Sequence, residues 1–286
     1  VLQWHTDQNQ LGHVFTYGDL LPDNEFFSFL AQTPRLKPYR WMHSVKTGNY
    51  DAATDLLIRN ASESPNSNTQ DLQFQLSLAK LTCKLAEGEG SQPMLVDDDH
   101  DEDKQEPPPL SRRRKLIDSR LDLIHAQQIL LALEDDKIDD KPLFSTERLL
   151  DMALKRIDTH KSPIEMAMVA LAVAKTHLEE YPESTMPARV WCAVLQHDWD
   201  TSWKNWMAET IKPSRDTILN QTLFGALWKE VQEQSVDHHA IQFDGDLETA
   251  VLQMLGQSNN VDLKRMVQSV ITVDITRSLP ITTMEE

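Results

Sequence analysis

The residues whose types could support chemistry in this chain are two cysteines, ten histidines and a run of acids. Cys83 has His43 and Asp71 as conceivable partners, but their spacing does not resemble that of a nucleophile with its base. His238 and His239 are neighbours, and neighbouring helical side chains point about 100° apart, which is poor for chelation. We therefore expect no catalytic, cofactor-binding or metal-binding residue and no enzyme. Catalysis in the Cys83 or His238 region is kept as an alternative.

The acids gather in residues 87–110, EGEGSQPMLVDDDHDEDKQEPPPL. Within it, the acidic run Asp97–Asp103 could bind calcium, but it lacks the alternating ligands, central glycine and final glutamate of an EF-hand loop. Gly88 and Gly90 alone do not make a phosphate-binding loop. Such a segment buries too little apolar surface to offset its ordering entropy, so we predict an acidic, proline-rich mobile loop at 88–110. It divides a first helical group, 1–87, from a second, 111–286, and we expect the two to pack as one α-helical domain.

Four basic residues, Arg112 to Lys115, follow this segment directly. They could form a nuclear import signal, although local ion pairs with the neighbouring acids explain them more simply.

Four tryptophans, Trp191, Trp199, Trp203 and Trp206, lie within sixteen positions, and we expect them in a core or facing a partner. His197 and Asp198 are interpreted as a helix end that faces water.

The composition limits the partners and the compartment. With 45 acidic and 28 basic residues, the net charge is −17, which disfavours binding to a nucleic acid backbone. Two cysteines cannot build a disulfide framework, which suggests a reducing compartment. No apolar run approaches the length of a membrane span, and no small-molecule site is expected. The chain begins at Val1 without a basic-then-apolar leader, so we expect a fragment of a longer protein.

Apolar residues recur every three or four positions over most of the chain, which predicts an all-α fold. We expect about eleven helices stacked as an irregular, solenoid-like assembly, with Gly48 in a left-handed turn and Ser162 capping the helix that starts at Pro163. The expected helices are 23–31, 38–47, 49–62, 70–87, 111–134, 145–160, 163–181, 187–197, 214–234, 244–257 and 261–274. Stacked helical pairs of this kind favour protein binding over catalysis.

Four segments are similar to one known family. WMHSVKTGNYDAA (41–53) resembles the tryptophan, threonine-glycine and paired-alanine stretch of the C-terminal helical domain of nucleoporin one-hundred-thirty-three. LSLAKL (76–81), VWCAVLQHDW (190–199) and RDTI (215–218) resemble later helices of that domain in the same order. The four segments span about residues 40–230. The proline-rich acidic insertion and residues 235–286 depart from the family's pattern.

The resemblance implies a structural scaffold of the nuclear pore complex at the nuclear envelope, within the Y-shaped outer-ring complex, supporting mRNA and protein transport. Its implied partner is the C-terminal helical domain of nucleoporin one-hundred-seven, bound end to end. From the residues alone, an interaction adaptor of another large assembly, of the vesicle-coat or proteasome-lid type, stays open.

Helix 70–87 carries two apolar rows, which predicts that more than one of its faces is buried. One row is Phe74, Leu78, Leu81 and Leu85. The other is Leu72, Leu76, Ala79 and Cys83. We predict that the second row, with Gln75 and Lys80 at its rim, binds the partner. The alternative is that both rows belong to the core.

Overall fold

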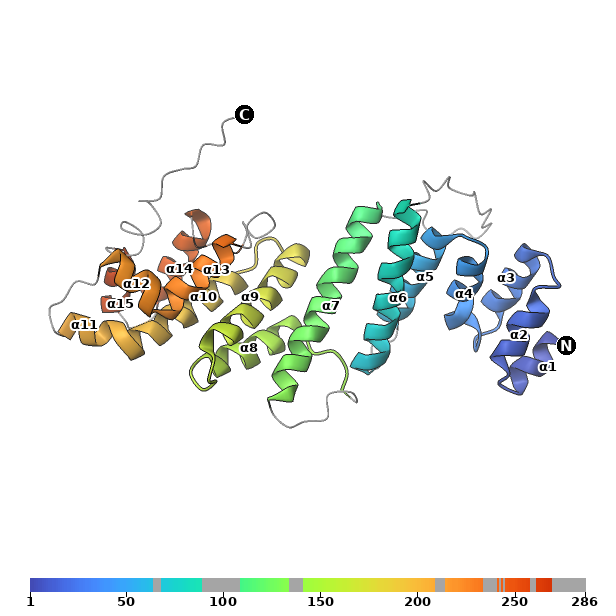
Figure 1. Cartoon of the computed structure of the whole chain (residues 1–286), viewed down its shortest axis with the longest axis horizontal. Helices are drawn as coiled ribbons and strands as arrows, with labels where there is room; N and C mark the ends of the chain where they lie inside the picture. The colour runs from blue at the N-terminus through green and yellow to red at the C-terminus, as the bar shows by residue number, and fades with distance from the viewer. Residues whose placement is uncertain are drawn as a thin grey trace, which may run out of the picture. The chain divides into compact units, whose positions relative to one another are not determined.

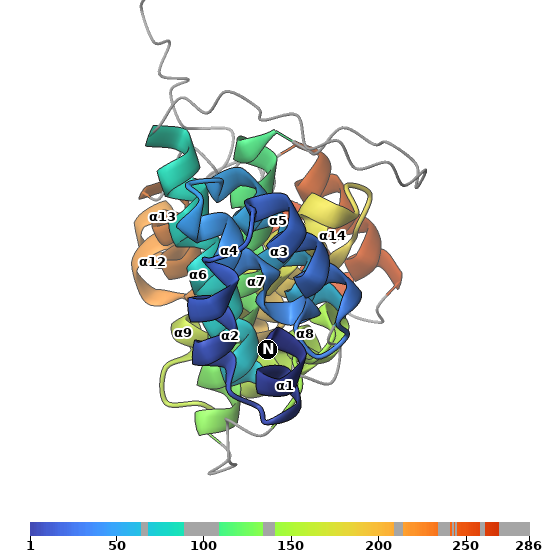
Figure 2. The ribbon, with the colours of Figure 1, turned by 90° about the vertical axis from the view of Figure 1, so that its right-hand side faces the viewer.

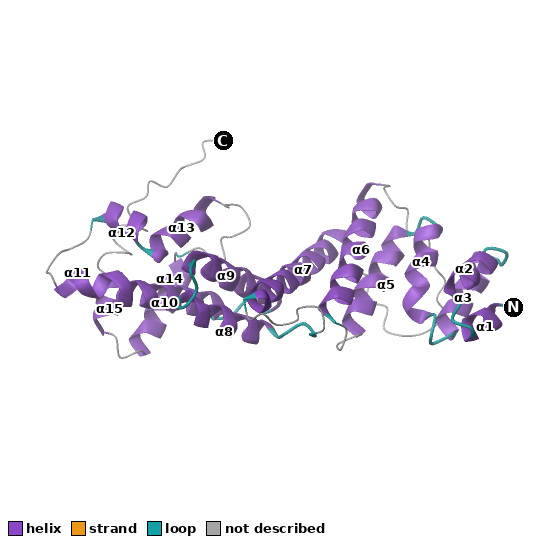
Figure 3. Ribbon diagram, turned by 60° about the horizontal axis from the view of Figure 1, so that its bottom comes forward, coloured by secondary structure: helices purple, strands orange, loops and turns teal. Residues whose placement is uncertain are grey.

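The computed structural model describes residues 1–63, 68–88, 109–133, 141–208, 214–233, 241, 243, 245–257 and 261–268. All regular structure in this part of the chain is helical, without a strand, as Figure 3 shows. The all-α prediction is therefore confirmed. Within the same residues, no helix has the length and apolar character needed to cross a membrane.

The chain divides into two compact units, and the division falls inside one helix. Unit 1 comprises Val1–Ile124 and Lys137–Leu143, and unit 2 comprises His125–Asp136 and Phe144–Glu286. The helix α7 (Leu110–Ala132) thus contributes its first turns to unit 1 and its last turns to unit 2. The acidic segment at 88–110, where the sequence predicts the division, lies mostly outside the described part, which omits residues 89–108.

Unit 1 is a series of helices that pack mainly on their neighbours in the chain (Figure 1). They are α1 (Leu2–Asp7), α2 (Leu11–Gly18), α3 (Asp23–Gln32), the 3₁₀ turn η1 (Lys37–Tyr39), α4 (Arg40–Lys46), α5 (Tyr50–Glu63) and α6 (Thr69–Gly88). In Figure 2 the N-terminal helices face the viewer. The first of these helices, α1 to α3, share a core of Val14, Phe26, Leu30 and Leu36.

Unit 2 contains the last part of α7 and the helices that follow (Figure 1). They are α8 (Thr146–Ile157), α9 (Pro163–Glu180), α10 (Met186–Asp198), the π-helical turn η2 (Trp199–Trp203), α11 (Lys204–Ala208), α12 (Arg215–Gln221), α13 (Leu223–Glu233), α14 (Gly245–Gln257) and α15 (Val261–Met266). The most extensive packing in this unit is between α8 and α9, and α10 packs on α9, α13 and α14.

The helix boundaries differ from the expected ones where short helices occur. Helices α1 and α2 were not expected, and the single helix predicted at 214–234 is two, because α12 ends at Gln221 and α13 begins at Leu223. Gly48 adopts a φ of +75°, as predicted for a left-handed turn. Ser162 makes no capping hydrogen bond, whereas Ser145 accepts one from the Arg148 N–H and caps α8.

The tryptophan cluster belongs mainly to the core of unit 2. Trp191 and Trp203 are fully buried, and the Trp191 indole N–H donates to the Ile241 carbonyl at 2.9 Å. Phe224 and Phe243 meet the Trp191 ring edge-on, with centroids 5.5 and 5.4 Å away. Aromatic pairs in this arrangement add to the stability gained from burial, so the core role accounts for these two tryptophans.

Asp198 was interpreted as a solvent-facing helix end, and the structure corrects this. The residue is only 2% exposed, and its two carboxylate oxygens accept the backbone N–H groups of Leu223 and Phe224 at 2.8 and 2.7 Å. It therefore caps α13 from the end of α10. Burial raises the pKa of Asp198 to about 6, against the lowering effect of these two hydrogen bonds and of His197.

Candidate protein-interaction surface

The helix α6 lies against α5 and is built into the core of unit 1 through one of its two apolar rows. Leu72, Leu76, Ala79 and Cys83 recur every three or four residues, so they share one face of the helix. They pack with Leu57 and Ala61 of α5 and with Ile117 and Ile124 of α7. Leu76 and Ala79 are completely buried. This row is therefore occupied by the protein's own side chains.

The predicted partner-binding row is thus corrected: Leu72, Leu76, Ala79 and Cys83 are not available to a partner in this structure. The two predicted rim residues, Gln75 and Lys80, are half-buried, and the Lys80 ammonium pairs with Asp118 of α7 at 2.6 Å. The physical reason is that α5 and α7 cover this face. Which of two apolar rows is covered depends on these neighbouring helices and not on the spacing within α6.

The other row of α6 points to solvent. Phe74 is 62% exposed, Leu81 58% and Leu85 48%, while Leu78 is half-buried against the core cluster. Their spacing of four, three and four residues is that of a helix–helix seam, about 16 Å long at 1.5 Å per residue. A contiguous row of exposed large apolar side chains on a well-packed helix is typical of an interaction site.

Two polar contacts, one buried and one partly exposed, link α5 to α6 and to α7. The Thr54 and Thr82 hydroxyl groups, on α5 and α6, hydrogen-bond at 2.8 Å inside the core. Arg113 of α7 is 4% exposed, and its guanidinium meets Asp51 at 2.6 Å and Asp55 at 3.1 Å, both on α5. Burial raises the pKa of Asp55, although the Arg113 charge acts to lower it. The outer row of α6 is therefore held on a rigid support.

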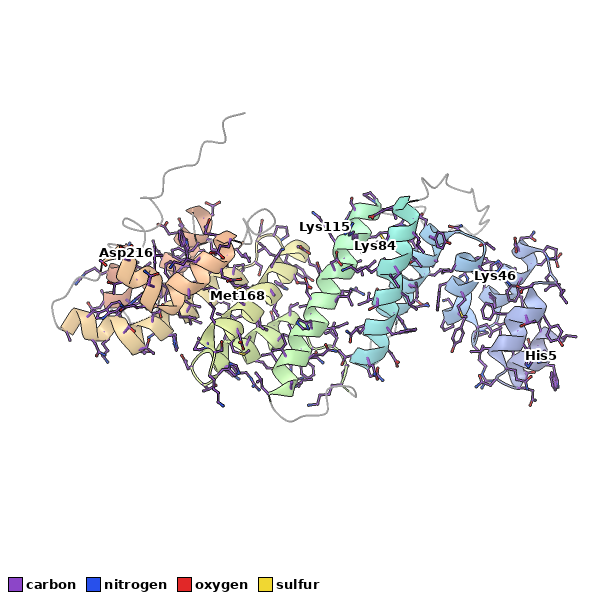
Figure 4. The ribbon with its side chains drawn as sticks, viewed as in Figure 1. His5, Lys46, Lys84, Lys115, Met168 and Asp216 are labelled. Atoms are coloured by element: carbon purple, nitrogen blue, oxygen red, sulfur yellow. The ribbon has the colours of Figure 1, made fainter. Side chains whose placement is uncertain are left out.

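The basic run after the acidic segment is used partly for ion pairing. Arg113 pairs with α5, and Arg114 lies 3.4 Å from Glu87 of α6 and 3.9 Å from Asp118 of its own helix. Glu87 is the first residue of the acidic segment, while Asp51, Asp55 and Asp118 lie on α5 and α7, and the acids at 89–108 are outside the described residues. Arg112 and Lys115 are exposed, and Figure 4 shows Lys115 and Lys84 near the same ends of α7 and α6.

The candidate chemical groups do not come together in the described residues. Cys83 lies in the α5–α6–α7 cluster, with its thiol 3.8 Å from the Leu110 carbonyl, while His43 packs edge-on against Phe26 at 5.2 Å. Burial, followed by the nearby Glu87 charge, raises the pKa of the Cys83 thiol. Burial also raises the pKa of Cys192 to about 11. Neither thiol is activated as a nucleophile at neutral pH.

Metal chemistry has no support in the part of the chain that the structure describes. No group of three histidine, cysteine or acidic side chains there could hold a metal ion. His238, His239 and the acidic run Asp97–Asp103 lie outside the described residues.

Comparison with known protein families finds no family model that matches the chain. Comparison with curated proteins likewise finds no significant match.

Proposed function

We propose that this chain is a non-enzymatic helical scaffold that binds another helical protein through the outer row of α6. The observation that carries the proposal is the exposure of Phe74, Leu81 and Leu85 on a helix whose opposite face is fully packed. Their heptad-like spacing suits a partner helix lying nearly parallel or antiparallel to α6. Burying large apolar side chains of this kind supplies most of the energy of a typical protein interface.

The resemblance to the C-terminal helical domain of nucleoporin one-hundred-thirty-three supports a more specific proposal. According to this more specific proposal, the chain is part of the Y-shaped outer-ring complex of the nuclear pore and binds the C-terminal helical domain of nucleoporin one-hundred-seven end to end. It would then support mRNA and protein transport through the nuclear envelope. The segment LSLAKL (76–81), on which part of the resemblance rests, lies on α6 itself.

The direct test mixes the chain with the C-terminal half of nucleoporin one-hundred-seven at micromolar concentration and measures mass by light scattering during chromatography. The proposal predicts a stable one-to-one complex. It further predicts that Leu81→Glu prevents the complex, because the substitution places a charge in the centre of the apolar row. Circular dichroism should stay unchanged, since Leu81 is more than half exposed.

Tyr181→Glu is the matched control, because Tyr181 is equally exposed, at 58%, but lies at the end of α9 in unit 2. It should leave the complex intact. Separate elution of two well-folded proteins would count against the nuclear pore proposal and favour an adaptor of another large assembly, such as a vesicle coat or proteasome lid. A complex that tolerates Leu81→Glu would count against the α6 surface.

A further inference from the structure

Unit 2 contains an apolar groove of about 500 Å³ between three of its helices. This volume lies within the range of about 300 to 1,000 Å³ that ligand-binding clefts occupy. The groove is lined by Ile129 of α7, Ile164, Glu165, Met168 and Val169 of α9, and Glu230 of α13. All of these residues belong to unit 2, so the groove is formed within one compact body.

The sequence of α9 explains why this groove is apolar. From Met166 to Ala174 the helix reads MAMVALAVA, nine residues without a polar side chain. A helix that is apolar on every side normally has every side covered. Here Met166, Ala167, Ala170, Leu171, Val173 and Ala174 are buried. Met168 and Val169 are only half-buried and Ala172 is exposed, so the groove face has the composition of an interior but lies at the surface.

An exposed glutamate favours one kind of partner. Glu165 is exposed on the first turn of α9, so the α9 wall carries a carboxylate at the solvent edge, whereas Glu230 of α13 is half-buried and interacts within the chain. No lysine or arginine is among the groove's lining residues. The net charge of −17 adds a long-range attraction for basic partners. An apolar floor with an acidic wall at Glu165 is complementary to a segment that combines apolar and basic side chains.

We propose that this groove binds an amphipathic helix of a partner protein. The helix would place leucine, methionine or phenylalanine at i, i+3 and i+4 positions on Met168 and Val169, and lysine or arginine beside Glu165. Binding a helix in a groove between helices is a common mode of peptide recognition. The proposal does not rest on α6 or on the nuclear pore, because its surface lies in the other unit. A chain with both surfaces would connect two partners.

The experiment selects binding peptides from a displayed library of random sequences of about 15 residues, roughly four helical turns. Selection is run in parallel on the intact chain and on Met168→Glu, whose charge would lie on the groove floor (Figure 4 labels Met168). The expected outcome is enrichment, on the unsubstituted chain only, of peptides with apolar residues at helical spacing flanked by lysine or arginine. The most enriched peptide is then synthesised and its affinity measured by fluorescence anisotropy.

Glu165→Lys provides a second variant that does not challenge folding, because Glu165 is exposed. It should weaken the selected peptide and strengthen a version in which glutamate replaces the basic residues. Met168→Glu should weaken the selected peptide by about tenfold or more. Tyr181→Gln, an exposed site outside the groove lining, should change nothing.

Enrichment that is equal on both selection targets, an absence of enrichment, or enrichment of acidic peptides would overturn the proposal. Equal affinity of the peptide for the intact chain and for Glu165→Lys would also overturn it, because the acidic wall would then have no role. Circular dichroism of each variant establishes that a loss of binding does not come from a loss of helix.

Discussion

Leu76 and Leu81 lie on the same helix in opposite environments, so replacing each with alanine should give very different losses of stability. Leu76 is completely buried between α5 and α7, whereas Leu81 is 58% exposed on the outer row. Removing a buried leucine side chain from a packed core costs about 2 to 5 kcal/mol, because the transfer energy is lost and a cavity is left. For Leu76, whose surroundings come from three helices, we expect about 3 to 5 kcal/mol.

For Leu81 the same arithmetic gives a small number. Full burial of a leucine contributes about 2 kcal/mol, and the buried part of Leu81 is roughly two fifths of its surface, so about 0.8 kcal/mol is at stake. The higher helix propensity of alanine offsets a little of this loss. We therefore expect less than about 1 kcal/mol for Leu81→Ala.

The assay is urea unfolding followed by far-UV circular dichroism, with the free energy of unfolding compared between the two variants and the unsubstituted chain. The expected difference between the variants is at least about 2 kcal/mol. Equal destabilisation by the two substitutions would show that the outer row is also packed. An unchanged free energy of unfolding for Leu76→Ala would show that the row with Leu72, Leu76, Ala79 and Cys83 is not part of the core. That row would then again be a candidate for binding a partner.

Three further predictions concern the supports of the two units. A Cβ at Gly225 would lie 2.5 Å from backbone atoms of α12, so Gly225→Ala should lower the free energy of unfolding by about 1 to 3 kcal/mol, seen as a lower melting temperature. Because burial raises the pKa of Asp198 in the folded protein to about 6, the contribution of Asp198 to stability is greatest below pH 4 and falls as pH rises toward 6. The unsubstituted chain should therefore lose up to about 3 kcal/mol of unfolding free energy across this range relative to Asp198→Asn. Parallel curves of stability against pH for the two proteins would contradict the raised pKa. Arg113→Met should remove the cation that pairs with Asp51 and Asp55 and cost about 1 to 3 kcal/mol in urea unfolding, less than a fully buried pair because both carboxylates are partly exposed; an unchanged midpoint would contradict the linking role of Arg113.

The long helices could be predicted from the sequence because their signals are local. The helix α9 begins at Pro163, where proline is tolerated in a first turn, and α5 follows the left-handed turn at Gly48. The short helices α1 and α2 were missed, because helices of six and eight residues contain too few turns to show a clear apolar period.

The candidate site could be predicted only in part. The spacing in α6 showed that the helix carries two apolar rows, but the identity of the covered row is decided by α5 and α7, which are distant in the sequence. Asp198 was misinterpreted for the same reason, since its hydrogen-bond donors lie 25 and 26 residues further along the chain. Long-range partners of this kind leave no local signal.

The measurement that tests the proposed interaction surface most directly is calorimetric titration of the chain, and of Phe74→Ala, with the C-terminal helical domain of nucleoporin one-hundred-seven. Phe74 is 62% exposed, so burying it on binding removes about 120 Å² of its roughly 200 Å², or about 3 kcal/mol at 25 cal/mol per Å². We expect saturable binding by the unsubstituted chain and a dissociation constant more than about 100-fold higher for Phe74→Ala. Equal dissociation constants for the two proteins would contradict the proposed interaction surface.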